Sequence, residues 1–254
     1  MIVLLATVMC MANLVLVHGI TESSRSWDPL IGPLSASHRV LAVDLRGHGT
    51  ATHEPPYDLA AMTADVLTDM HRAGFDPASC ILIGHSLGAM VASAVAASVP
   101  CRGVINVDQS LRLADFQRGL QQLQPLLYGD DASFRAAIAL IFDSLRGPLS
   151  ASETQRIESM RRPDRDVVLA AWETILNSSA DELNRKVNAV AGSISGKYLS
   201  LHGMDAGDSY PQWLGAAIRN SSYEIWPDHG HYPHLVNPSR FVARVNEFVA
   251  AAES

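Results

Sequence analysis

A serine flanked by two glycines is the feature of this sequence best suited to covalent chemistry. Ser86 lies in the stretch Gly84-His85-Ser86-Leu87-Gly88, which follows a short apolar run and opens a helix-like one. A serine hydroxyl is a weak nucleophile until a neighbouring base accepts its proton, and that base is most often a histidine. Glycines on either side of Ser86 allow a strained turn and close packing around it. The sequence therefore predicts a nucleophilic serine on a sharp strand-to-helix turn.

Of the ten histidines, His231 is the best candidate for the base. It follows Gly230 in the loop after the last apolar run, ahead of a C-terminal helical segment. A loop in that position ends at the same edge of a parallel sheet as Ser86. His229 and His234 flank His231 and are competing candidates, although His229 is better explained as a surface turn residue.

A serine–histidine pair also needs a carboxylate that fixes the tautomer of the imidazole and stabilises the imidazolium. Asp205 is the preferred candidate, because it follows the apolar run 197–201. Asp208 lies in the same loop and is one alternative. Asp108, directly after the run 103–107, is the other alternative. For the oxyanion hole, the predicted donors are the backbone N–H groups of Leu87 and Ile20.

Elements that alternate along the chain must position these residues. Apolar runs at 13–17, 39–43, 79–83, 103–107, 197–201 and 222–226 read as buried strands. They are continuous and do not alternate with polar residues, as in sheets covered on both faces. Helical patterns at 59–73, 89–98 and 238–252 lie between or after them, which predicts a mostly parallel α/β sheet with helices on both faces. The stretch 109–194 lacks strand signals, so we expect one domain over 1–254 with a helical cap inserted at 109–194.

Four motifs, in this order along the chain, resemble those of the α/β-hydrolase superfamily. They resemble the oxyanion loop, a second conserved turn, the nucleophile elbow and the histidine end of that family: Val17-His18-Gly19-Ile20, Asp44-Leu45-Arg46-Gly47-His48-Gly49, Gly84-His85-Ser86-Leu87-Gly88 and Gly230-His231. The order Ser86, Asp205, His231 is also that of the family. The chain departs from it in the acid loop, where His202-Gly203-Met204-Asp205 is one residue shorter than usual, and some members place the acid where Asp108 lies.

The resemblance implies a serine esterase that forms an acyl-enzyme without a metal or another cofactor. Lactones, including acyl-homoserine lactones, are esters and fall within the same hypothesis. A carbon–carbon bond hydrolase and a cofactor-free perhydrolase would use the same triad and remain alternatives. Epoxide hydrolases and haloalkane dehalogenases are disfavoured, because they use an aspartate where this chain has Ser86. From a different class, a small-molecule receptor with vestigial catalysis is the remaining alternative.

Composition argues against two classes of partner, and the small-molecule ester or lactone substrate is what the resemblance implies. The 254 residues are 48% hydrophobic and 18% charged, with a formal net charge of −7. This charge argues against nucleic acid or an anionic membrane as a partner. The three widely spaced cysteines favour neither zinc nor disulfides, so we expect a cytoplasmic protein. The apolar segment 1–10 lacks a basic start, so we expect an edge strand or an upstream extension in preference to a signal peptide.

Several other residues have both a structural and a functional interpretation. Trp27 is an open case, because it could contact substrate or cap a helix. His18 is expected to bond to backbone within a turn, and Arg46 and His48 are expected to brace a loop. The basic cluster Arg161-Arg162 with Arg165 is expected to be solvated. The aromatic residues of the cap are expected to form its core: Phe134, Phe142 and Trp172.

Overall fold

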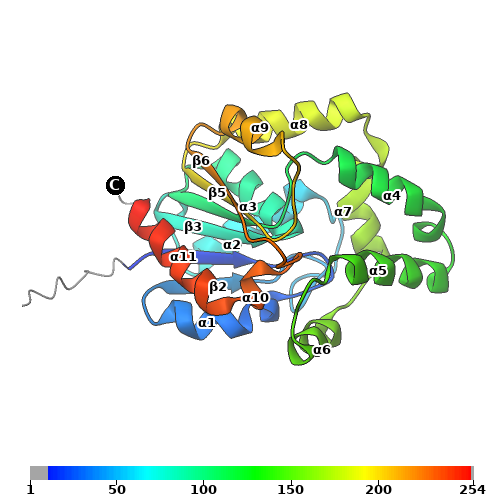
Figure 1. Cartoon of the computed structure of the whole chain (residues 1–254), viewed down its shortest axis with the longest axis horizontal. Helices are drawn as coiled ribbons and strands as arrows, with labels where there is room; N and C mark the ends of the chain where they lie inside the picture. The colour runs from blue at the N-terminus through cyan, green and yellow to red at the C-terminus, as the bar shows by residue number, and fades with distance from the viewer. Residues whose placement is uncertain (1–10, 253–254) are drawn as a thin grey trace, which may run out of the picture.

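Over residues 11–252, the protein forms a parallel sheet of six strands covered by helices on both faces (Figure 1). The computed structural model describes residues 11–252, so the expectation for segment 1–10 lies outside the described residues. The strand order is β2-β1-β3-β4-β5-β6, and every neighbouring pair is parallel. The predicted α/β architecture is confirmed. The strands are β1 (Asn13–Val17), β2 (Arg39–Val43), β3 (Cys80–His85), β4 (Gly103–Val107), β5 (Lys197–His202) and β6 (Ser221–Ile225).

Alternate residues of each central strand face two separate hydrophobic cores. In β1, Val15 and Val17 pack into one core, whereas Leu14 and Leu16 pack into the other, and all four are fully buried. This arrangement explains why the apolar residues of β1 are continuous and do not alternate with polar ones. The first core is covered by α2 (Leu59–Arg72), α3 (Leu87–Ser98), α8 (Ala180–Ser193) and α9 (Tyr210–Ala217), and the second by α1 (Asp28–Ser35) and α11 (Pro238–Ala251).

The segment 109–194, expected as one helical cap, has two parts in the structure. Four helices lie beyond the carboxyl ends of the strands (Figure 1), and we refer to them as the inserted helices. The fifth, α8, returns to the sheet and packs against α3. Side chains of Asp130, Ser150, Asp164 and Ser179 accept hydrogen bonds from first-turn amides and so fix where helices begin. The inserted helices are α4 (Ala114–Leu127), α5 (Asp131–Leu145), α6 (Ala151–Met160) and α7 (Arg165–Asn177).

Asn237 and Pro238 fix where α11 begins. Asn237 caps α11 by accepting a hydrogen bond from the Arg240 amide, and Pro238 is the first helical residue. A cap of this kind satisfies one of the amides that a helix leaves unpaired at its start.

Short helices complete the connections within residues 11–252. They are η1 (Ser24–Trp27), η2 (Pro77–Ser79) and α10 (Pro233–Val236).

Helix α3 approaches the sheet so closely at its first turn that side chains are excluded there. A Cβ atom on Gly88 would lie 2.2 Å from the carbonyl oxygen of Val17 in β1. A Cβ atom on Gly84 would lie 2.2 Å from the carbonyl oxygen of Gly88 itself. Both glycines of the motif are therefore needed for contact between backbones, and this contact fixes the position of the residue between them.

Replacement of Gly88 by alanine should destabilise the protein, whereas the same change at Gly119 should not. Gly119 lies in α4 with nothing near its Cβ direction, so Gly119→Ala should raise the free energy of unfolding by about 0.5–1 kcal/mol. Gly88→Ala should lower it by about 3 kcal/mol, because the backbone of β1 has to move. Urea unfolding measures both changes. Equal stability of the two variants would contradict the close contact.

Candidate active site

Ser86 occupies a strained turn between β3 and α3. Its backbone angles are φ 52° and ψ −123°, in a region that residues with side chains rarely adopt. The Ser86 amide donates a hydrogen bond to the Val107 carbonyl at 3.1 Å, which ties the turn to the end of β4. The side chain is partly exposed and lines a cavity between the sheet and the inserted helices. The turn therefore presents the hydroxyl at the carboxyl edge of the sheet.

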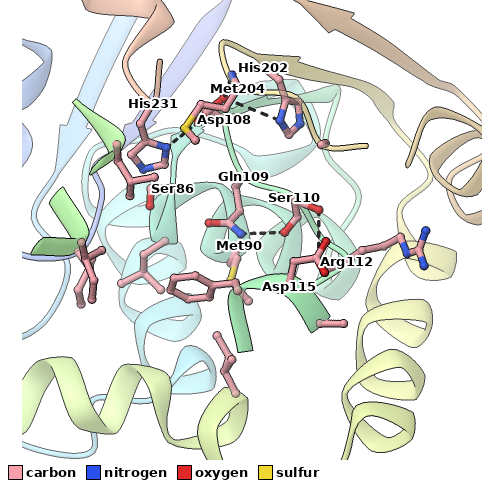
Figure 2. Close-up of a pocket in the computed structure, with 18 of the residues that line it drawn as sticks. Ser86, Met90, Asp108, Gln109, Ser110, Arg112, Asp115, His202, Met204 and His231 are labelled. Atoms are coloured by element: carbon pink, nitrogen blue, oxygen red, sulfur yellow. Dashed lines mark hydrogen bonds and ion pairs between the residues drawn. The ribbon is translucent and has the colours of Figure 1, made fainter. Parts of the chain in front are cut away.

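His231 lies in the loop after β6 and lines the same cavity as Ser86. Its Nδ1 atom is 2.6 Å from Oδ2 of Asp108, and both side chains are buried. Figure 2 shows Ser86 beside the His231 ring, with Asp108 on the far side of that ring. Because Nδ1 is engaged by a carboxylate, the proton of the neutral ring belongs on Nδ1, and Nε2 is left as the proton acceptor.

The carboxylate that contacts His231 is Asp108, which was one of the two alternatives. The prediction that Asp205 lies at this ring is wrong. Asp205 is exposed at the rim of the cavity, and its Oδ1 accepts a hydrogen bond from the Gly207 amide at 2.8 Å. Asp208 is exposed as well and does not line the cavity. The loop after β5 turns back on itself at Asp205, and this local turn holds the carboxylate away from the imidazole.

The loop after β5 instead supplies donors to Asp108. The amides of Gly203 and Met204 donate hydrogen bonds to Oδ1 of Asp108 at 2.7 and 3.0 Å. Burial alone would raise the pKa of Asp108, but the hydrogen bonds with His231 and with the Met204 amide, together with the electrostatic interaction with the His231 and His202 rings, lower it below its ordinary value. Asp108 is therefore an ionised, buried carboxylate at neutral pH.

The histidines of the site are neutral bases in a buried environment. Burial is the main cause that lowers the pKa of His231, and nearby His85 lowers it further, whereas the hydrogen bond to Asp108 raises it. His202 lies 3.8 Å from Asp108, and burial lowers its pKa to about 4. At neutral pH, His231 is therefore in the form that can accept a proton.

Two buried histidines, His18 and His48, hydrogen-bond to the backbone of the predicted oxyanion loop around Ile20. The Thr21 amide, one residue after Ile20, donates a hydrogen bond to Nε2 of His48 at 3.0 Å. Nδ1 of His18 contacts the Gly19 carbonyl at 2.7 Å, while its Nε2 accepts a hydrogen bond from the Leu45 amide. The structural roles expected for His18 and His48 are confirmed. Burial lowers the pKa of both rings, so each is neutral and can accept one bond while donating the other.

Ile20 and Leu87, the predicted oxyanion donors, both line the cavity beside Ser86. Leu87 is the first residue of α3, so its amide has no acceptor within that helix. The positive end of the helix dipole also points at this position. Ile20, in the loop after β1, and Leu87, at the start of α3, thus lie at the same cavity as Ser86.

The cavity has a volume of about 620 Å³, within the range of small-molecule sites. Its floor is the sheet edge with Ser86, Asp108 and His231, and the inserted helices form its opposite wall. Figure 2 shows the polar residues that follow Asp108, among them Gln109, along one side. The apolar lining comes mostly from the inserted helices and α3: Met90, Phe116, Ile141, Phe142, Leu145, Ala171, Trp172 and Ile175.

The open case of Trp27 is decided by the structure: Trp27 is the N-cap residue of α1 and does not line the cavity. It is fully buried against His234 and Phe241 in the core beneath α1 and α11. Two other expectations about individual residues need correction. Phe142 and Trp172 are expected in the core of the inserted helices, but the structure places both at the cavity wall.

The second correction concerns Arg161 in the basic cluster, whereas Arg162 is exposed as expected. The Arg161 side chain is only 14% exposed, because it packs over the Phe142 ring and contacts Tyr232. Its carboxylate neighbour Glu22 is buried two residues after Ile20 and was not identified from the sequence. A carboxylate so close to a predicted oxyanion donor is the signal that could have revealed it.

Two other classes of site are not found within the part of the chain that the structure describes. Between residues 11 and 252, no cluster of three or more histidine, cysteine, aspartate or glutamate residues is placed to hold a metal ion. Over the same residues, no helix combines the length and apolar character needed to span a membrane.

Comparison with known proteins places this architecture among hydrolases. A model of the family described as "Alpha/beta hydrolase family" matches residues 14–245. The chain is 23% identical to the pimeloyl-[acyl-carrier protein] methyl ester esterase of Aliivibrio salmonicida, over 94% of this chain and 92% of that protein. It is 24% identical to the sn-1-specific diacylglycerol lipase ABHD11 of Danio rerio, over 93% of this chain and 78% of that protein.

Some relatives are matched over only part of their length. The chain is 33% identical to epoxide hydrolase 4 of Mus musculus, but the match covers 34% of this chain and 24% of that protein. The match to the biotin biosynthesis bifunctional protein BioHC of Cellvibrio japonicus covers 92% of this chain and 47% of that protein, at 26% identity.

Solved structures share the fold along nearly the whole chain. The esterase RhEst1 of Rhodococcus sp. ECU1013 superposes with a TM-score of 0.74 and 25% identity, covering 95% of this chain and 91% of that one. A structure described as a putative epoxide hydrolase mutant of Pseudomonas aeruginosa superposes with a TM-score of 0.76 at 18% identity, covering 96% and 90% of the two chains.

The strain at Ser86 predicts that glycine stabilises this position. Ser86→Gly should raise the free energy of unfolding by about 1 kcal/mol relative to Ser86→Ala, because glycine adopts these backbone angles without steric penalty. Urea unfolding of the two variants checks this difference. A glycine variant less stable than the alanine variant would show that the turn is not strained.

Proposed function

The chain belongs to the alpha/beta hydrolase family, and we propose that within this family it is a carboxylic ester hydrolase that forms an acyl-enzyme on Ser86. The observation that carries the proposal is the hydrogen bond between His231 and Asp108, next to Ser86 in one cavity. Two relatives matched over most of their own length, a methyl ester esterase and a lipase, also act on esters by name.

In the proposed reaction, Ser86 Oγ attacks the carbonyl carbon of the ester while its proton moves to Nε2 of His231. Asp108 holds the ring in the correct tautomer and stabilises the imidazolium that forms. The negative charge that develops on the carbonyl oxygen is stabilised by the Ile20 and Leu87 amides. His231 then donates its proton to the departing alcohol, which leaves the acyl group on Ser86.

Deacylation repeats these steps with water as the nucleophile. His231 accepts a proton from the water, which attacks the acyl carbon, and then returns the proton to Ser86 as the acid is released. A lactone is a cyclic ester and would follow the same steps without losing its alcohol portion. Epoxide opening through an enzyme ester would need a carboxylate at position 86, so a serine there argues against that activity.

Replacement of the proposed acid should separate Asp108 from Asp205. Asp108→Asn should lower kcat by about 10⁴-fold, as expected for loss of the orienting acid of a triad. Asparagine tolerates the positive φ of 53° at this position, so the backbone should be retained. Asp205→Asn should stay within about threefold of wild type, because Asp205 bonds only to its own loop. Hydrolysis of p-nitrophenyl butyrate measures both.

Ser86→Ala serves as the reference for complete loss of turnover and of fluorophosphonate labelling. A large effect of Asp205→Asn together with a small effect of Asp108→Asn would reverse the assignment of the acid. Turnover retained by Ser86→Ala would refute the acyl-enzyme mechanism. A wild-type protein that neither turns over esters nor becomes labelled would favour a binding protein with the same fold.

The apolar wall of the cavity predicts a preference for longer acyl chains. Each added methylene that leaves water should raise kcat/KM by about threefold to fourfold until the cavity is filled. Trp172→Ala should move the preferred length upward in a series of p-nitrophenyl esters from acetate to decanoate, because Trp172 lines the cavity. Phe134→Leu is the matched control, since Phe134 is buried among the inserted helices but does not line the cavity. An unchanged length preference in Trp172→Ala would place the acyl chain elsewhere.

A further inference from the structure

Glu22 is a buried carboxylate that the proposed triad does not use. It is 2% exposed and lies in the oxyanion loop, two residues after Ile20. Its Oε1 accepts a hydrogen bond from the Tyr232 hydroxyl at 2.8 Å, and Tyr232 directly follows His231. Its Oε2 lies 3.7 Å from Nδ1 of His85, the residue directly before Ser86. One carboxylate therefore contacts the sequence neighbours of both the proposed nucleophile and the proposed base.

Arg161 connects Glu22 to the inserted helices. It lies just after α6, its Nη2 donates a hydrogen bond to the Tyr232 hydroxyl, and it is 3.9 Å from Oε1 of Glu22. Its guanidinium packs 3.5 Å from the centre of the Phe142 ring, and Phe142 lines the cavity. A cation and an anion buried together stabilise each other only when both are held in place, as these contacts do.

Backbone hydrogen bonds reinforce the same connection. The Arg162 amide donates to the Thr21 carbonyl at 2.9 Å, which joins the segment after α6 to the oxyanion loop. The His231 amide donates to the Leu145 carbonyl at 2.9 Å, which joins the histidine loop to the end of α5. The inserted helices are thus attached at both loops that carry the proposed chemistry.

The electrostatic surroundings of His231 contain two buried carboxylates on different sides. Asp108 contacts the ring directly, whereas Glu22 acts from the side of His85, whose Nε2 lies 2.8 Å from the His231 carbonyl oxygen. Burial alone would raise the pKa of Glu22, but its contacts with His85, Arg161 and Tyr232 lower it well below the ordinary value. The charged and titratable groups facing this region are His18, Glu22, His48, His85, Asp108, Arg156, Arg161, His202, Asp205, Tyr232 and His234.

We propose that Glu22 is a positioning residue whose buried charge stabilises the protonated form of His231, and that Arg161 limits this effect while joining the inserted helices to the oxyanion loop. The inference rests on the proposed function. Glu22 does not touch the reacting atoms, so it acts through His85, Tyr232 and the electric field at His231. Burial lowers the pKa of His231, and both Asp108 and Glu22 oppose that shift.

The pH dependence of kcat/KM tests this role. In the proposed mechanism, activity is lost as pH falls through the pKa of His231, because the protonated ring cannot act as a base. Glu22→Gln removes the charge with little change of shape, so the acid limb should move to lower pH by about 0.5 unit or more. The value of kcat at the plateau should fall by roughly threefold to tenfold. A decrease of about 0.5 to 1 unit in the pKa of His231 means that its protonated form, which builds up in the transition state, is less stable by that factor.

Two further variants separate charge from structure. Tyr232→Phe removes the hydrogen bond to Glu22 but keeps the charge, so its acid limb should stay within about 0.2 unit of wild type. Arg161→Gln removes the cation and leaves Glu22 in place, so its acid limb should move to higher pH. Opposite shifts from Glu22→Gln and Arg161→Gln are the expected signature, measured on p-nitrophenyl butyrate with circular dichroism as the check of folding.

The inference is overturned if folded Glu22→Gln keeps the wild-type acid limb, or if Tyr232→Phe moves the limb as far as Glu22→Gln does. If Glu22→Gln does not fold, Arg161→Gln decides, and an unchanged or lowered acid limb refutes the proposal. Wild type without turnover or fluorophosphonate labelling of Ser86 would refute the proposed function itself. An active wild type with unshifted variants would refute only the role of Glu22.

Discussion

The contact between the first turn of α3 and the backbones of β1 and β3 is the constraint on which the rest of the site depends. It leaves no room for a side chain at Gly84 or Gly88, so Ser86 is held in a turn that it would not adopt alone. Because β1, β3 and β4 are adjacent and parallel, their following loops meet at this turn. The segment around Ile20, Ser86 and Asp108 therefore converge from three neighbouring strands.

A second set of interactions orients the histidine from the other half of the sheet. Asp108 receives two amide hydrogen bonds from the loop after β5 and contacts His231 in the loop after β6. The two loops themselves meet closely, since a Cβ atom on Gly203 would lie 2.1 Å from the Gly230 carbonyl oxygen. Asp108 follows β4 and is hydrogen-bonded to the loops after β5 and β6. These hydrogen bonds stabilise its negative charge, so the carboxylate can remain ionised although it is buried.

The sequence predicted those parts of the molecule that depend on local pattern. Six apolar runs gave the strands, and glycines in fixed positions around Ser86 gave the turn, because both signals lie within a few residues. The choice between Asp108 and Asp205 depended on the direction in which the loop after β5 folds, and a pattern in the sequence does not show that the Asp205 side chain bonds back to the Gly207 amide of its own loop. The pair Glu22 and Arg161 was missed since its partners are far apart in the chain and each alone is typical of a surface.

The position of Asp108 directly after β4 has a consequence for which parts of the sequence can change during evolution. The loop after β5 serves Asp108 through the main-chain N–H groups of Gly203 and Met204. Gly203 has no room for a side chain, but the N–H group at position 204 is one that every residue except proline provides. Met204, Asp205 and Ala206 line the cavity, and the side-chain hydrogen bond of Asp205 lies within its own loop. This loop can therefore accumulate substitutions that change which molecules enter, while the groups that would carry out the reaction stay untouched.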